Sequence, residues 1–116
     1  MPRPLRGEVW KVRFDPSEGA EIRKIRPAVV LSRDGVGRLP LRIVVPITDW
    51  RSIYGSFAWF VRLPATSANG LSKESGADAF QAKSVSETRF IGRLGALTPD
   101  QIADIAAAIA VCVGAP

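Results

Sequence analysis

Three cations crowd the entrance to an apolar strand near the start of this chain. The segment EIRKIRPAVVLS places Glu21, Arg23, Lys24 and Arg26 directly before an apolar run at residues 28–31. A guanidinium can donate two parallel hydrogen bonds to phosphate oxygens, and a lysine adds a compact positive charge. The folding of the chain does not require a cluster of cations at this point. The binding of a phosphate would require one. The segment therefore indicates a phosphate-binding site with a carboxylate beside it.

Two prolines, Pro27 and Pro46, lie inside apparent strands. Proline is confined in sheets to edges, first positions and bulges, and Pro27 also restricts Arg26 to extended geometry. One interpretation is that both prolines simply mark edge positions. The other is that the two strands are shaped to present Arg26 and Thr48 at a shared rim.

The positive charge of the chain is concentrated in its first half. The 116 residues carry 16 Lys+Arg and 11 Asp+Glu, a formal net charge of +5. Residues 1–62 hold 12 of the cations and 6 of the carboxylates, which gives +6, and the remainder holds 4 and 5, which gives −1. Apolar residues make up 47% of the chain, enough for the core of one domain over residues 1–116. We therefore expect an anionic partner at the first half.

The absence of histidine and the single cysteine, Cys112, exclude several kinds of site. A Ser-His-Asp triad, a Cys-His pair and a two-histidine ribonuclease mechanism all need histidine. The same counts argue against a zinc site, and neither a metal nor another cofactor is expected. We expect Cys112 to be a small apolar helix residue rather than a nucleophile. Without a long apolar run or a signal-peptide pattern, no membrane association and a cytoplasmic location are expected.

Alternating polarity and turn residues predict a mainly β fold closed by one helix. The helix is the clearest element, because Thr98-Pro99-Asp100-Gln101 matches a capping box and Gly114 suits its end. Its apolar stripe consists of Ile102, Ile105, Ala106, Ile109 and Val113. The expected strands are 7–14, 26–32, 41–48, 57–64, 76–85 and 89–97, with loops or turns at 15–24, 33–40, 49–56 and 65–75. Short strands of this kind, packed with one helix, indicate a small β-barrel-like domain.

Several motifs resemble those of the MazF/PemK toxins. RGEVWKVRFDPSEGAEIRKIRPAVVLS resembles the N-terminal motif of that family, in which a strand leads through D-P-x-x-G-x-E to R-P-[AV]-[VL]-V-[LI]-S. VVPIT at 44–48, QAKSV at 81–85 and RLGALTPDQI at 93–102 resemble later family segments, so the likeness covers residues 6–113. It implies an SH3-like barrel, a homodimer, sequence-specific cleavage of RNA, and a cognate antitoxin that neutralises the toxin.

The resemblance also implies three catalytic residues, Arg26, Thr48 and Glu21. Without histidine or metal ligands, the accessible reaction is attack of a neighbouring 2′-hydroxyl on phosphorus, which leaves a 2′,3′-cyclic phosphate and a 5′-hydroxyl. Arg26 would stabilise the developing charge, Thr48 would bind a phosphate oxygen or orient the 2′-hydroxyl, and Glu21 is the candidate base. Each has a structural alternative as a surface cation, a strand-end residue or a loop charge. Whether Arg26 also donates a proton is open, since its pKa exceeds about 12.

Further residues are expected to bind single-stranded RNA. Cations would follow the phosphodiester backbone, and aromatic side chains would stack on bases. Trp59, which lies in a strand pattern, is expected to be a core residue, and Trp10 is expected to lie in the core or at the dimer interface. The expected RNA-binding residues are Arg23, Lys24, Gln81, Lys83, Ser84, Trp50 and Tyr54.

Three other functions fit parts of the sequence. A non-catalytic module for single-stranded nucleic acid would use the same cations and aromatics, but it would bind RNA without cleaving it. A toxin of related fold that targets gyrase would need no basic groove. A peptide-binding SH3-like module is disfavoured by the +6 charge of the first 62 residues.

Overall fold

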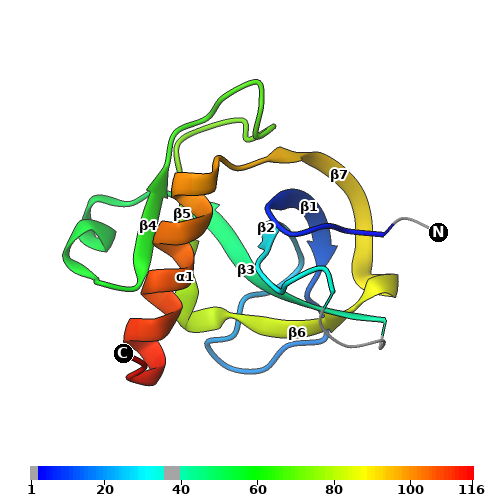
Figure 1. Cartoon of the computed structure of the whole chain (residues 1–116), viewed down its shortest axis with the longest axis horizontal. Helices are drawn as coiled ribbons and strands as arrows, with labels where there is room; N and C mark the ends of the chain where they lie inside the picture. Colours follow the sequence, from blue (N-terminus) through cyan, green and yellow to red (C-terminus); the bar gives the residue numbers. More distant parts are fainter. Residues whose placement is uncertain (1–2, 36–39) are drawn as a thin grey trace.

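The longest strand, β3 (Leu41–Asp49), joins the two parts of a seven-stranded antiparallel sheet (Figure 1). In this computed structural model, which describes residues 3–35 and 40–116, β3 pairs with β2 on one edge. On the other edge it pairs first with β6 and then with β5. The strand order is β4-β5-β3-β2-β1-β7, and β6 pairs with β3 beside this path. The other strands are β1 (Glu8–Arg13), β2 (Ile25–Val30), β4 (Phe60–Leu63), β5 (Ser75–Asp78), β6 (Lys83–Ser86) and β7 (Phe90–Ala96).

The mainly β architecture with a C-terminal helix is confirmed, and one expected strand is wrong. The segment 76–85 forms two strands, β5 and β6, separated by a 3-10 turn, η2 (Ala79–Gln81). The turn forms because the Asp78 carboxylate accepts the Phe80 N–H at 3.2 Å. Two more 3-10 turns follow β3 and β6, η1 (Ser52–Ser56) and η3 (Glu87–Arg89). The expected turn at 33–40 lies partly outside the described residues.

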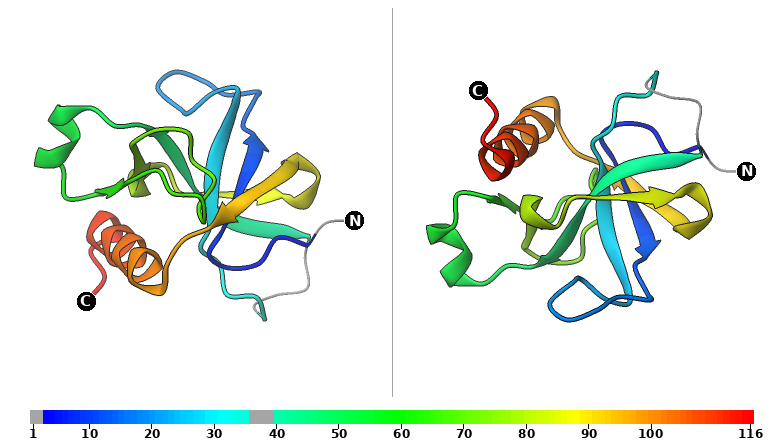
Figure 2. Two further views of the ribbon diagram at one scale, coloured as in Figure 1. Left: turned by 90° about the horizontal axis from the view of Figure 1, so that it is seen from above. Right: turned by 90° about the horizontal axis from the view of Figure 1, so that it is seen from below.

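Side chains on both faces of the sheet are buried, in two separate cores. The face covered by the C-terminal helix forms the first core, to which β1, β2 and β3 contribute Val9, Val29, Val45 and Ile47. The opposite face curls on itself to form the second core (Figure 2). The second core consists of Trp10, Val12, Phe14, Ala28, Val30, Val44, Val85 and Phe90. Burial on both faces explains why β2 and β3 are almost continuously apolar instead of alternating.

Helix α1 (Pro99–Val113) begins with the predicted capping box. The Thr98 N–H donates to Gln101 Oε1 at 3.0 Å, and the Gln101 N–H donates to Thr98 Oγ1 at 3.2 Å. Gly114 ends the helix with a left-handed φ of 69°. Ile102, Ile105, Ala106 and Ile109 belong to the first core as expected. Val113 does not, because the last turn extends beyond the strands and leaves this side chain 71% exposed.

Within the described residues, no helix combines the length and the apolar character that a bilayer crossing requires.

Candidate RNA-cleavage site

The hydrogen-bond ladder between β2 and β3 ends just before Arg26. The Leu31 N–H donates to the Ile43 carbonyl at 2.9 Å, so hydrogen-bonded pairs alternate from 31/43 to 29/45 and would next fall at 27/47. Pro27 has no N–H to donate at that pair. The observed pairing accordingly stops at Ala28 and Pro46, and β3 continues from Ile47 onward with β5 as its partner. The two strands are therefore free to diverge beyond Pro27.

Continuing the same register places Arg26 opposite Thr48 at this divergence. Residues that face each other in an antiparallel pair share a face of the sheet, and alternate residues along a strand share it too. Thr48 thus lies on the face of Val44, whose partner on β6 is Lys83. The register brings Arg26, Thr48 and Lys83 to one face, at the rim of the second core. This arrangement supports the interpretation in which the prolines shape the two strand ends.

The loop 15–24 closes over this rim and carries Glu21. Its base is closed by a hydrogen bond of 2.8 Å from the Phe14 N–H to the Lys24 carbonyl. Lys24 has a φ of 64°, unusual for a residue with a side chain, and it directly precedes β2. Inside the loop, the Glu21 carboxylate accepts the Glu18 N–H at 2.8 Å. Ile22 packs against the second core and anchors the loop to the sheet.

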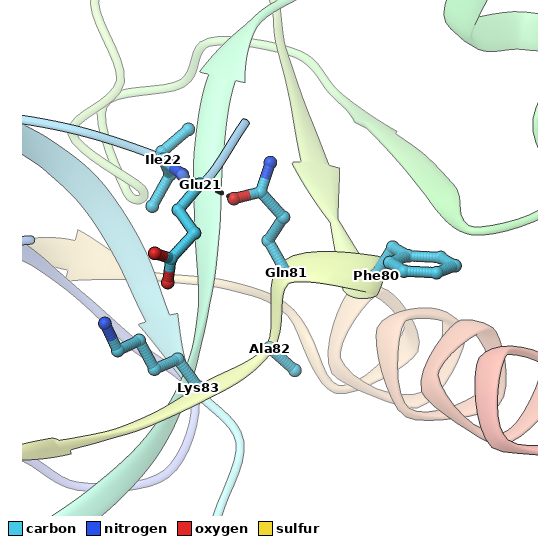
Figure 3. Close-up of a pocket in the computed structure, with 6 residues that line it drawn as sticks. All are labelled: Glu21, Ile22, Phe80, Gln81, Ala82 and Lys83. Carbon is cyan, nitrogen blue, oxygen red and sulfur yellow. Dashed lines mark hydrogen bonds between the residues drawn. The ribbon is translucent and has the colours of Figure 1, made fainter. Parts of the chain in front are cut away.

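A pocket of about 280 Å³ lies between this loop and the η2–β6 segment. It is lined by Glu21, Ile22, Phe80, Gln81, Ala82 and Lys83. In Figure 3 the Glu21 carboxylate and the Lys83 ammonium group point into the same space from opposite walls. The pocket therefore presents one anionic and one cationic group on the face that carries Arg26 and Thr48.

The cations of this face have no carboxylate partner among the described residues. The ion pairs within 4.0 Å that this part of the chain forms involve Arg42, Arg62, Lys73 and Arg93. Arg26 makes one long contact, from Nε to the Arg23 carbonyl at 3.3 Å, and Arg23 donates to the Gly19 carbonyl at 3.0 Å. Most donors of these two guanidinium groups are left available. An anion with several oxygen acceptors, such as a phosphodiester, suits them.

Four other residues were predicted to bind RNA, and their side chains face or contact other parts of the protein than the pocket cations do. Gln81 uses its side-chain amide inside the protein, where it accepts the Ile22 N–H. Ser84 pairs with Ile43 and so points to the face opposite Lys83. Trp50 and Tyr54 meet edge to face at 5.9 Å. One face of the Tyr54 ring is covered by Phe60 at 4.0 Å, and the Arg62 guanidinium lies 5.1 Å from the centre of the Trp50 ring.

The predicted resemblance is confirmed by a family model. PemK-like, MazF-like toxins of type II toxin-antitoxin systems match residues 5–113 of this sequence. The chain belongs to this family. A curated relative, "Endoribonuclease MazF9" of Mycobacterium tuberculosis, is 33% identical over 106 residues, which cover 86% of this toxin and 87% of the relative.

Solved structures give the same fold. The structure of MazF from Deinococcus radiodurans aligns with a TM-score of 0.76 at 26% identity and covers 96% of each chain. A mycobacterial endoribonuclease solved with its cognate antitoxin aligns with a TM-score of 0.75 at 19% identity and covers 98% of each chain. At that identity the second likeness concerns the fold alone.

Two residues of the toxin's pocket region were not predicted from the sequence, Phe80 and Asp78. Phe80 lines the pocket, is 68% exposed, and touches Trp59 edge to face at 5.8 Å. Asp78 is buried and holds both η2 and the Gln81 side chain. Both lie in a segment expected to be one strand, which contains no proline or Asn-Gly pair to mark a turn. The available signal for Phe80 was an aromatic residue directly before QAKSV at 81–85, the stretch that resembles a family segment.

Cys112 is an unfavourable nucleophile, as expected. Partial burial, together with the negative charge of Asp78, raises the pKa of its thiol. A thiol with a raised pKa supplies little thiolate at neutral pH.

Proposed function

We propose that this toxin is a sequence-specific endoribonuclease that cleaves single-stranded RNA, including mRNA, without a metal ion. The observation that carries the proposal is the position of Arg26. Its guanidinium has no carboxylate partner in the described part of the chain, and the β2–β3 register, continued beyond its last pair at Ala28 and Pro46, would place Arg26 opposite Thr48. It also shares a face with Lys83, beside the Glu21 pocket. Such a group can bind a phosphate whose charge increases during reaction.

The reaction that suits these residues begins at the 2′-hydroxyl of the substrate. Its oxygen forms a bond to the adjacent phosphorus while its proton passes to the Glu21 carboxylate. Arg26 and Thr48 donate hydrogen bonds to the non-bridging oxygens as negative charge accumulates there. The bond from phosphorus to the 5′-oxygen then breaks, that oxygen takes up a proton from water, and Glu21 returns its proton to the solvent. The products are a 2′,3′-cyclic phosphate and a 5′-hydroxyl.

The surrounding residues would hold the RNA strand. Arg23, Lys24 and Lys83 provide positive charge for phosphates on either side of the cleaved bond. Phe80 provides an open aromatic face at the pocket, whereas the rings of Trp50 and Tyr54 are partly covered by other side chains. Single-stranded RNA is commonly held by stacking of its bases on such rings.

We expect Phe80→Ala to raise KM for RNA about tenfold with little change in kcat, because base–aromatic stacking contributes about 1–3 kcal/mol. Phe80→Tyr keeps the ring and should retain the wild-type KM. Ile53→Ala, which removes an apolar side chain 60% exposed on η1, is the matched control. Steady-state cleavage of an RNA oligonucleotide measures both constants, and an unchanged KM in Phe80→Ala would show that no base stacks there.

Partners follow from the same proposal. We expect a cognate antitoxin with an acidic disordered segment to occupy the basic face and compete with RNA. We also expect a homodimer, for which Val111 and Val113 at the end of α1 are exposed apolar side chains. Action on mRNA implies a cytoplasmic location, where a single unpaired cysteine is compatible with reducing conditions.

A substrate that lacks one oxygen tests the reaction. Cleavage sites are first mapped on a long RNA, and an oligonucleotide is then made with 2′-deoxyribose at the nucleotide on the 5′ side of one cut. We expect this oligonucleotide to bind but to resist cleavage at that bond, while the all-ribose version is cut. Cleavage of the deoxy-substituted bond would refute 2′-hydroxyl attack, and RNA that is bound but never cut would favour the non-catalytic binding module.

A further inference from the structure

Asp78 is a buried carboxylate that the proposed reaction does not use. It lies at the end of β5, is 8% exposed, and pairs with Phe60 of β4. One carboxylate oxygen accepts the Phe80 N–H at 3.2 Å, and the other accepts Gln81 Nε2 at 3.3 Å. Burial raises the pKa of this carboxyl, although the hydrogen bonds from Gln81 and Phe80 oppose the rise. Because burial disfavours a charged carboxylate, the presence of Asp78 at this position needs a structural or functional explanation.

The charge of Asp78 determines which way the Gln81 amide points. An ionised carboxylate only accepts hydrogen bonds, so the donor end of the amide, Nε2, must face it. The acceptor end, Oε1, is thereby directed away from Asp78, to the loop 15–24. There it accepts the backbone N–H of Ile22 (Figure 3). A carboxylate on the sheet thus fixes the hydrogen-bond polarity of a contact to the loop.

The contact falls at the functional end of that loop. Ile22 directly follows Glu21 and directly precedes Arg23, and Gln81 precedes Lys83 by two residues on the opposite wall of the pocket. At its base the loop is held by the Phe14 N–H, which donates to the Lys24 carbonyl at 2.8 Å, and by Arg89 Nη1, which donates to the Asp15 carbonyl at 2.6 Å. Of these hydrogen bonds, the one to Gln81 lies beside the candidate base. This hydrogen bond is therefore placed to fix the distance between Glu21 and the face that carries Arg26 and Thr48.

We propose that Asp78 and Gln81 are positioning residues, which hold the loop 15–24 through the Ile22 N–H so that Glu21 faces the scissile phosphate. The proposal rests on the proposed ribonuclease function for its catalytic consequence, but the hydrogen-bond relay itself exists without substrate. Gln81 then acts through the loop instead of reading a base. Neither residue needs to touch the RNA.

Two isosteric substitutions test the relay. Each alone places two like groups opposite each other, and the two together reverse the direction of the hydrogen bond between residues 78 and 81. In Asp78→Asn, the carbonyl oxygen is needed by the Phe80 N–H, so the new amide N–H group faces Gln81 Nε2 and two donors oppose each other. In Gln81→Glu, two carboxylates oppose each other. The double variant restores complementarity, since the introduced asparagine amide donates to the introduced glutamate carboxylate, which still accepts the Ile22 N–H. Asp104→Asn, the same change at an exposed position of α1, is the control.

The first measurement is amide hydrogen exchange at Ile22 by NMR, without RNA. We expect each single variant to speed this exchange about tenfold, as loss of one hydrogen bond of about 1.4 kcal/mol would. The double variant should return to within about threefold of wild type, and Asp104→Asn should match wild type. Far-UV circular dichroism and thermal unfolding confirm that each variant is folded. Unchanged Ile22 exchange in the folded single variants would overturn the relay.

The second measurement is kcat and KM for RNA cleavage by the same proteins. We expect the single variants to lose about tenfold in kcat with a smaller change in KM, and the double variant to recover both. Recovered Ile22 protection without recovered kcat would assign Gln81 a direct role on the RNA and overturn its positioning role. If wild type cleaves no RNA, the ribonuclease proposal fails, while the exchange data still decide whether the relay exists.

Discussion

The Arg26→Ala variant should cleave RNA roughly 10²–10³-fold more slowly than wild type, the usual cost of removing one preorganised donor to a transition-state charge. The effect should fall on kcat, because the phosphate gains negative charge during the reaction. Arg26 has no carboxylate partner within 4.0 Å among the described residues, and the one side-chain hydrogen bond it makes there is the 3.3 Å bond from Nε to the Arg23 carbonyl. Its removal should therefore leave the fold intact.

Two companion variants separate geometry from charge. Arg26→Lys keeps the charge but loses the paired donors, so its rate should lie between those of wild type and Arg26→Ala. Arg51→Ala removes an exposed arginine from the segment before η1 and should cleave at the wild-type rate. Single-turnover cleavage at saturating enzyme gives the comparison. A folded Arg26→Ala protein within about threefold of wild type would remove Arg26 from the catalytic set.

The largest expected change in stability is that of Gly70→Ala. Gly70 has a φ of 69°, and an added Cβ would overlap the carbonyl oxygen of Leu94 and lie 2.7 Å from its carbon. The neighbouring Asn69 is buried and accepts the N–H groups of Thr66 and Leu71 at 3.0 and 2.9 Å, which leaves the loop little freedom to shift. We expect a loss of at least about 3 kcal/mol, from left-handed strain and overpacking together.

Gly19→Ala is the matched control for this variant. Gly19 also has a positive φ, 56°, but no atom of its surroundings lies within 4 Å of the position that an added methyl group would take. It should therefore lose only about 1 kcal/mol, the cost of the backbone conformation alone. Urea unfolding of the two variants measures the difference. Equal losses would show that the loop bearing Gly70 moves away from β7 without cost.

The sequence was sufficient for the elements whose signals are local. The capping box at Thr98 and Gln101 needs four consecutive residues, and the loop 15–24 is marked by Asp-Pro and Gly19. Pro27 marks the interruption of a strand in the sequence itself. That Arg26 and Thr48 lie beyond the end of the β2–β3 pairing is evident only from the register, because the register depends on which strand β3 pairs with.

The sequence pattern did not predict contacts between segments that are far apart along the chain. The division of 76–85 into β5, η2 and β6 depends on a buried carboxylate that caps the turn, and nothing in the local polarity of Asp78 predicts its burial. Gln81 was expected at the RNA because its neighbours resemble a family segment. Its contact with Ile22 joins residues 59 positions apart, and only the folded chain brings them together.

The most direct test of the ribonuclease proposal is a map of the ends produced when wild-type protein acts on a long single-stranded RNA in EDTA. We predict discrete cuts at a recurring sequence, with 5′-hydroxyl ends and 2′,3′-cyclic phosphates. Intact RNA, cleavage that needs an added divalent ion, or fragments with 5′-phosphate ends would contradict the account.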